Sequence, residues 1–94
     1  MDNPWETLFN LLTGSITRGE VVGTDNVGDY TIDTCYTSDH GWETAVRKGD
    51  NSWVIVARYD DKEAAEKGHG IWTSLCAADP TGAYSVQTGE YENF

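Results

Sequence analysis

The sequence predicts an α+β fold, in which two amphipathic helices pack on an antiparallel meander sheet of three or four strands. Two patterns support this class: side chains alternate along residues 29–36, and apolar side chains recur at helical spacing along 61–77. The connections between the predicted strands are too short for crossover helices, which excludes parallel pairing. A chain of 94 residues matches the size of one small domain, predicted to span 1–94.

Residues 4–13 predict a short amphipathic helix. Asn3 can cap this helix, Pro4 occupies its first position and Gly14 can end it. Its apolar side chains lie at helical spacing: Trp5, Leu8, Phe9 and Leu12. A helix this short is marginal in water, so we expect its apolar face to dock on the domain or on another chain.

Three strands are predicted, at 29–36, 42–47 and 53–59, with a short edge strand at 20–23. The first is predicted to be half-buried, because its two faces differ in polarity. The third, WVIVARY, is rich in β-formers throughout and is typical of a central strand. We expect one face to meet the helix through five side chains: Tyr30, Ile32, Tyr36, Trp42 and Val46.

The second helix is predicted at about 61–77. Asp60 and Glu63 have the spacing of a capping box, and Pro80 ends the helical pattern. His69 lies at the edge of the apolar stripe, where its ring can hydrogen-bond a strand, and Gly68 lets the helix approach the sheet closely. Gly70 is expected to face solvent. The stripe comprises Ala64, Ala65, Gly68, Ile71, Trp72, Leu75 and Cys76.

The tail at 81–94 has a weaker pattern. One short strand is predicted at Tyr84–Gln87, followed by the acidic aromatic end GEYENF. An edge strand, a docked arm and a flexible terminus are all compatible with this composition.

The net charge is −10, from 16 acids and 6 bases, and long segments contain no Lys or Arg. Direct binding to nucleic acid or to an anionic membrane is disfavoured, because such binding depends on basic side chains. A partner with a basic surface, or simple solubility, remains. Residues 1–14 lack the pattern of a secretory signal, so we expect a cytoplasmic protein.

Metal binding and catalysis are not expected. The Cys and His residues are Cys35, His40, His69 and Cys76, and the last two lie about 10.5 Å apart along one helix, too far to share a zinc ion. We expect both cysteines to be reduced, although a disulfide between them would close a long loop. No spacing of nucleophile, base and acid indicates an enzyme, and no cofactor motif is present.

Three short motifs occur between residues 41 and 72: Trp42-Glu43-Thr44 in one strand, Arg58-Tyr59 at the end of another, and Glu63-Ala64 with Gly68-His69 in the second helix. With these motifs the segment resembles a group of small proteins encoded by bacteriophages and prophages. The resemblance implies a phage origin and a compact α+β unit. It implies no catalytic residue, because the group has no settled activity. Residues 1–28 and 77–94 lie outside it.

The sequence therefore predicts a non-enzymatic phage accessory protein that binds, and inhibits, a host or defence protein. Small acidic phage proteins that occupy basic nucleic-acid-binding grooves are a known class, and this chain is similar in size and charge. Residues 29 and 33 would lie about 13 Å apart on a strand, which indicates a general acidic surface more than a copy of a phosphate row. A virion or assembly component is the alternative. The predicted partner-binding residues are Asp25, Asp29, Asp33, Asp39 and Glu43.

Overall fold

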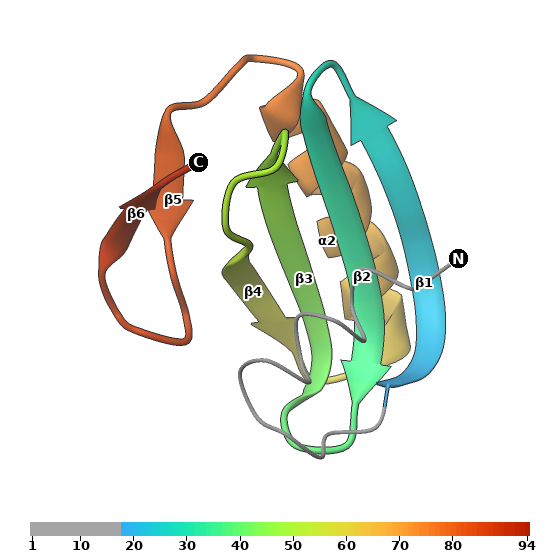
Figure 1. The fold of residues 1–94 in the computed structure, drawn as a ribbon. Helices are drawn as coiled ribbons and strands as arrows, with labels where there is room; N and C mark the ends of the chain where they lie inside the picture. The colour runs from blue at the N-terminus through green and yellow to red at the C-terminus, as the bar shows by residue number, and fades with distance from the viewer. Residues whose placement is uncertain (1–17) are drawn as a thin grey trace.

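The computed structural model describes residues 18–94, which form a four-stranded antiparallel sheet, a helix and a two-stranded hairpin (Figure 1). The predicted α+β class and the meander order β1-β2-β3-β4 are confirmed for these residues. The helix predicted at 4–13 lies outside them. The elements are β1 (Arg18–Val27), β2 (Tyr30–Thr37), β3 (Gly41–Lys48), β4 (Val54–Tyr59), α2 (Lys62–Cys76), β5 (Gly82–Tyr84) and β6 (Tyr91–Asn93).

The two edge strands differ from the prediction. β1 is ten residues long and pairs along the whole of β2, whereas the sequence predicted a strand at 20–23. Its register with β2 slips between Arg18 and Gly23, so β1 lacks the regular alternation by which a strand is recognised. The prediction that β4 is a central strand is wrong, because β2 and β3 occupy the centre of the sheet.

β4 contains a β-bulge. Ala45 of β3 pairs with Ile55, but the preceding Thr44 pairs with Ala57, which leaves Val56 as an extra residue. Every later residue of β4 therefore points to the face opposite to the one that uninterrupted alternation would give.

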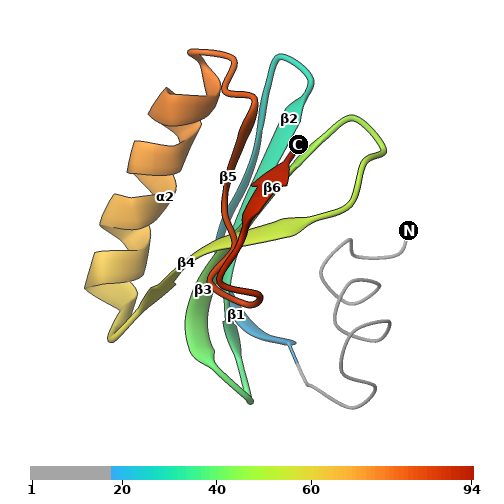
Figure 2. The same ribbon diagram turned by 90° about the vertical axis from the view of Figure 1, so that its left-hand side faces the viewer.

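α2 lies against one face of the sheet (Figure 2). The cap is Asp61 and not Asp60, because Oδ1 of Asp61 accepts a hydrogen bond from the backbone N–H of Ala64 at 2.8 Å. Beneath the helix lies the main apolar cluster, formed by Tyr30, Ile32, Val46, Val54, Val56, Cys76 and Ala83.

The apolar stripe of α2 is wider than the face that contacts the sheet. Ala65, Gly68 and Cys76 are buried as predicted. Ile71 and Leu75 belong to the same stripe, yet they are 58% and 45% exposed. The outer side of α2 therefore carries apolar surface that the described residues leave open to solvent.

The face of the sheet opposite α2 is buried as well. Cys35, Ala45 and Ile55 form a second apolar cluster there, with Trp53 beside it. The prediction that β2 is half-buried is therefore wrong at its centre, where side chains on both faces are inaccessible to solvent. Cys35 and Cys76 lie in clusters on opposite faces of the sheet, and no disulfide joins them.

The tail docks as the hairpin β5–β6. The predicted strand at Tyr84–Gln87 is correct only at Tyr84, because β5 ends there and residues 85–90 join the two short strands. The backbone N–H of Val86 donates to the carbonyl of Ile55 at 2.8 Å, which ties this turn to the edge strand β4. At the end of the chain, the rings of Phe94 and Tyr30 pack edge to face with centroids 5.7 Å apart.

Candidate functional site

Two of the five predicted partner-binding carboxylates are buried. Asp33 is inaccessible to solvent and accepts a hydrogen bond from the hydroxyl of Thr24 at 3.0 Å. Glu43 is 1% exposed, and its carboxylate accepts hydrogen bonds from Arg58 Nε at 2.9 Å and Thr37 Oγ1 at 3.1 Å. A partner cannot reach these two side chains in this conformation.

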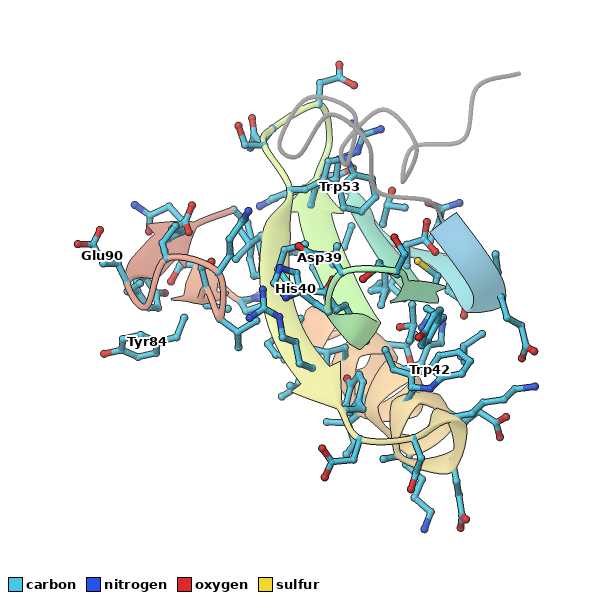
Figure 3. The ribbon with its side chains drawn as sticks, turned by 90° about the horizontal axis from the view of Figure 1, so that it is seen from below. Asp39, His40, Trp42, Trp53, Tyr84 and Glu90 are labelled. Carbon is cyan, nitrogen blue, oxygen red and sulfur yellow. The ribbon has the colours of Figure 1, made fainter. Side chains whose placement is uncertain are left out.

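The other three carboxylates are exposed but lie apart. Asp25 is on β1 and binds the ring of His69, whereas Asp29 lies in the turn between β1 and β2. Asp39 lies in the turn at the other end of β2 and contacts His40 at 2.8 Å, as Figure 3 shows from that end of the sheet. The five residues do not form one surface, and their role in binding stays a prediction.

A continuous chain of hydrogen bonds crosses the interface between α2 and the sheet. His69 Nε2 lies 2.6 Å from Asp25 Oδ2, and His69 Nδ1 lies 2.7 Å from the hydroxyl of Thr34. The Thr34 hydroxyl is 2.6 Å from that of Thr44, which in turn is 3.0 Å from the Tyr59 hydroxyl. This polar chain takes one residue from each of the four strands and one from α2.

The direction of each hydrogen bond in this chain depends on which side-chain atoms can donate and which can only accept. The carboxylate of Asp25 accepts, so Nε2 of His69 donates to it, and we assign Nδ1 as the acceptor of the Thr34 hydroxyl. Thr34 then accepts from Thr44, and Thr44 accepts from Tyr59. The hydroxyls of Thr34 and Thr44 therefore each donate and accept, and Tyr59 donates at the end of the chain. Burial raises the pKa of Tyr59, which keeps its phenol protonated.

The order carboxylate, imidazole, hydroxyl resembles the connectivity of a hydrolase triad. The Thr34 hydroxyl, however, is completely buried between α2 and the sheet and already bonds to two side chains. No substrate carbonyl can approach it in this conformation. The arrangement fits a network that fixes α2 on the sheet, because a satisfied buried network specifies one packing geometry.

Two glycines make room for the polar chain. A Cβ atom at Gly68 would overlap the ring and hydroxyl of Tyr59, and one at Gly23 would lie 3.0 Å from Nε2 of His69. The prediction that Gly68 serves close packing is therefore confirmed, with Tyr59 as its neighbour. The three short motifs noted in the sequence each contribute to the polar chain or its packing, through Thr44, Tyr59, Gly68 and His69. Two of these motifs also contact each other on the opposite face of the sheet, where Glu43 binds Arg58.

Replacing His69 with leucine is expected to lower the free energy of unfolding by about 2 kcal/mol, because the buried Thr34 hydroxyl loses its acceptor. His40 offers a matched control, since its side chain is 40% exposed and contacts the neighbouring Asp39. His40→Leu should change the stability by less than about 0.5 kcal/mol. Urea denaturation measures both, and equal losses would show that the His69 hydrogen bonds contribute nothing.

Within residues 18–94, no three His, Cys, Asp or Glu side chains are grouped as metal ligands. Both ring nitrogens of His69 are engaged by Thr34 and Asp25. The thiol of Cys76 is buried, which raises its pKa to about 11 and keeps it protonated near neutrality.

An acidic end of the sheet was not predicted from the sequence. We define it by Asp29, Asp50 and Asp79, which belong to the β1–β2 turn, the β3–β4 turn and the segment after α2. The two turns adjoin, because the N–H of Gly49 donates to the carbonyl of Asp29 at 2.7 Å. Asp79 accepts from Tyr30 at 2.8 Å and pairs with Lys48 at 3.3 Å, and both contacts lower its pKa.

A hollow of about 270 Å³ opens at this acidic end. Its wall combines the carboxylates of Asp29 and Asp79 with apolar atoms of Val27, Tyr30 and Cys76. Burial, with the hydrogen bond to Asp79, raises the pKa of Tyr30 to about 12, so its hydroxyl stays a donor. Sequence spacing gave no signal for this site, because its residues come from three separate segments.

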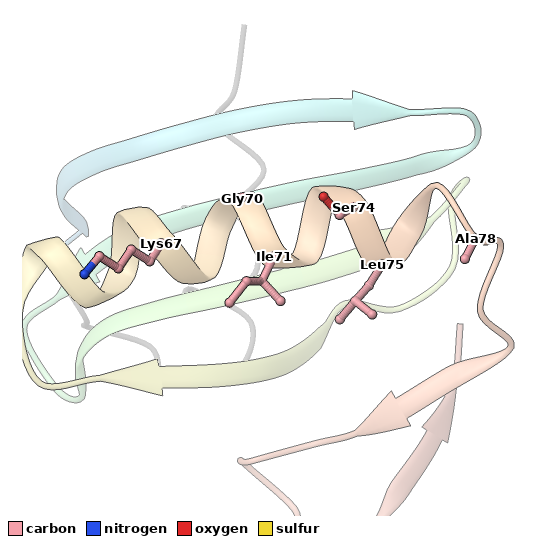
Figure 4. Close-up of a pocket in the computed structure, with 6 residues that line it drawn as sticks. All are labelled: Lys67, Gly70, Ile71, Ser74, Leu75 and Ala78. Carbon is pink, nitrogen blue, oxygen red and sulfur yellow. The ribbon is translucent and has the colours of Figure 1, made fainter.

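A second hollow, of about 550 Å³, runs along the exposed side of α2 (Figure 4). We call the residues that line it the outer face of α2. They are Lys67, Gly70, Ile71, Ser74, Leu75 and Ala78.

No protein-family model, curated protein or solved structure matches this chain. None of the helices in residues 18–94 is long and apolar enough to cross a membrane. The functional proposal below therefore depends on the contacts, burial and charge of these residues.

Proposed function

We propose that this protein is a non-enzymatic bacteriophage accessory protein that binds, and thereby inhibits, a host or defence protein with a basic surface in the cytoplasm of the infected cell. The observation that carries this proposal is the hollow at the acidic end, where Asp29 and Asp79 lie beside an apolar wall. A Lys or Arg side chain has the matching chemistry, because its aliphatic stem packs on apolar atoms while its charged head meets a carboxylate.

The charge balance of the described residues supports an acidic docking surface. The chain has six basic residues and a much larger number of acidic ones. The exposed carboxylates of Asp29 and Asp50 have no ion pair among the described residues. Docking at the acidic end uses these two residues and Asp79. Most of the chain's bases already pair with their own acids: Lys48 with Asp79, Arg58 with Glu43, Lys62 with Glu20 and Lys67 with Glu63.

The test is capture of host proteins on the immobilised chain, with two charge-matched variants. The first combines Asp29→Asn, Asp50→Asn and Asp79→Asn; the control combines Asp60→Asn, Glu66→Gln and Glu90→Gln, which remove equal charge elsewhere on the exposed surface. A basic host protein should bind the wild type and the control, and its binding to the first variant should fall at least about tenfold.

Circular dichroism establishes that both variants keep the wild-type fold before the comparison. Equal capture by the two variants would contradict docking at the acidic end. Failure of the wild type to retain any basic protein would contradict the proposed function itself.

A virion or assembly component is the second candidate. The exposed Ile71 and Leu75 on the outer face of α2 favour it, because apolar surface of this kind commonly marks a contact with another chain.

A further inference from the structure

The outer face of α2 has the features of a helix-to-helix contact. Ile71 and Leu75 are exposed and lie one turn apart, so they form an apolar ridge. Beside the ridge, Gly70, Ser74 and Ala78 are small residues at intervals of four, which leave a shallow hollow along the helix (Figure 4). A ridge next to a groove is the surface that a second helix needs in order to pack closely.

Gly70 is not explained by contacts among residues 18–94. A glycine inside a helix costs about 1 kcal/mol relative to alanine. Gly68 offsets this cost by admitting Tyr59, whereas a Cβ atom at Gly70 would meet no atom within 4 Å outside the neighbouring backbone of its own helix. If another helix packed against α2 at Gly70, the missing side chain would allow the two backbones to come close, just as Gly68 allows Tyr59 to pack against α2 inside the domain.

The charges along α2 favour an antiparallel partner. Glu63 lies in its first turn, and the last turn of this helix carries no basic residue, so the negative end of its dipole lacks a nearby cation on α2. Lys67 lies at the opposite end of the outer face, where it forms a solvent-exposed ion pair with Glu63 that a partner helix can replace. In an antiparallel pair of these helices, Lys67 of each copy reaches the last turn of the other.

We propose that a second copy of this chain docks on the outer face of α2, with the two helices antiparallel about a twofold axis near residues 72 and 73. Ile71 of one copy then meets Leu75 of the other, and the small residues allow the two helices to come close. The same face serves both copies, as a twofold contact requires. This inference concerns a surface separate from the acidic end and does not depend on the proposed partner.

The physical balance makes this a weak dimer. One helical face supplies less than the roughly 800 Å² per partner that stable interfaces bury. The net charge of −10 on each copy also opposes association. Because salt screens this repulsion, the dimer should become stronger as ionic strength rises, the opposite of an association driven by charge attraction.

Sedimentation velocity over a concentration series tests the proposal on the full chain. Leu75→Glu should raise the dimer dissociation constant at least about tenfold. Tyr84→Glu is the matched control, because Tyr84 is 71% exposed on β5, away from the outer face of α2, and should leave the constant within about twofold.

A further variant distinguishes specific packing of the two helices from non-specific hydrophobic association. Gly70→Leu adds apolar surface but blocks the close approach of a second helix, so it should also weaken the dimer about tenfold or more. Stronger association of this variant would overturn the proposal. A wild-type chain that stays monomeric at the highest concentration and salt, or equal effects of Leu75→Glu and Tyr84→Glu, would overturn it as well.

Discussion

Replacing Gly68 with alanine should lower the free energy of unfolding by at least about 2 kcal/mol. Alanine is the better helix former by about 1 kcal/mol, so helix propensity alone predicts a more stable protein. The added Cβ would overlap the ring and hydroxyl of Tyr59, which is held in place by its hydrogen bond to Thr44. To relieve the overlap, either the Tyr59 ring must leave its hydrogen bond to Thr44 or α2 must move away from the sheet, which would strain the contacts of His69.

Gly70→Ala is the matched control, since it makes the same substitution in the same helix two residues away. Outside the neighbouring helix backbone, no atom lies within 4 Å of the added Cβ, so the free energy of unfolding should rise by up to about 1 kcal/mol. Urea denaturation at a dilute protein concentration measures both variants as monomers. Tyr59→Leu in the Gly68→Ala background should recover part of the loss, and the contact with Tyr59 is disproved if Gly68→Ala is as stable as Gly70→Ala.

Replacing Arg58 with methionine should cost about 3 to 5 kcal/mol, because it leaves the carboxylate of Glu43 without its cation. Glu43 is 1% exposed, and Thr37 would remain as the donor to its side chain. Methionine keeps most of the length of the aliphatic part of arginine, so the loss of stability arises mainly from the missing charge and not from a cavity.

A double-mutant cycle isolates this interaction. Glu43→Gln removes the buried charge, and the variant that combines it with Arg58→Met should be more stable than Arg58→Met alone. Lys62→Met is the control, because Lys62 and Glu20 form an ion pair whose side chains are both at least half exposed, and its loss should cost less than about 1 kcal/mol. Additive losses in the cycle would show that Glu43 and Arg58 act independently.

The sequence was sufficient to predict the elements in which local pattern and tertiary packing agree. β2 and β3 lie within about one residue of their predicted bounds, because their alternation reflects real faces of a sheet. α2 was predicted to within a residue at each end for the same reason. A hydrogen bond between His69 and a strand was also predicted, since a polar residue at the edge of an apolar stripe meets the sheet at its margin.

The remaining parts depend on contacts distant in sequence. β1 is held by its pairing with β2, and the β5–β6 hairpin has strands of three residues, too short for a periodic pattern. Asp33 and Glu43 were predicted to be exposed because they were expected on the face of the sheet opposite the helix, and that face is buried in the structure. Their burial requires partners such as Thr24 and Arg58, which no local pattern indicates.

The extra residue at Val56 gives β4 one residue more than its pairing with β3 requires. Ile55 and Ala57 already pair with the consecutive residues Ala45 and Thr44, so deleting Val56 would leave a regular strand with Arg58 still opposite Glu43. Such a deletion would remove a side chain from the main apolar cluster but would keep the register of the sheet. Length changes among related chains should therefore fall at this bulge or in the turn at 49–53, and should spare β2 and β3.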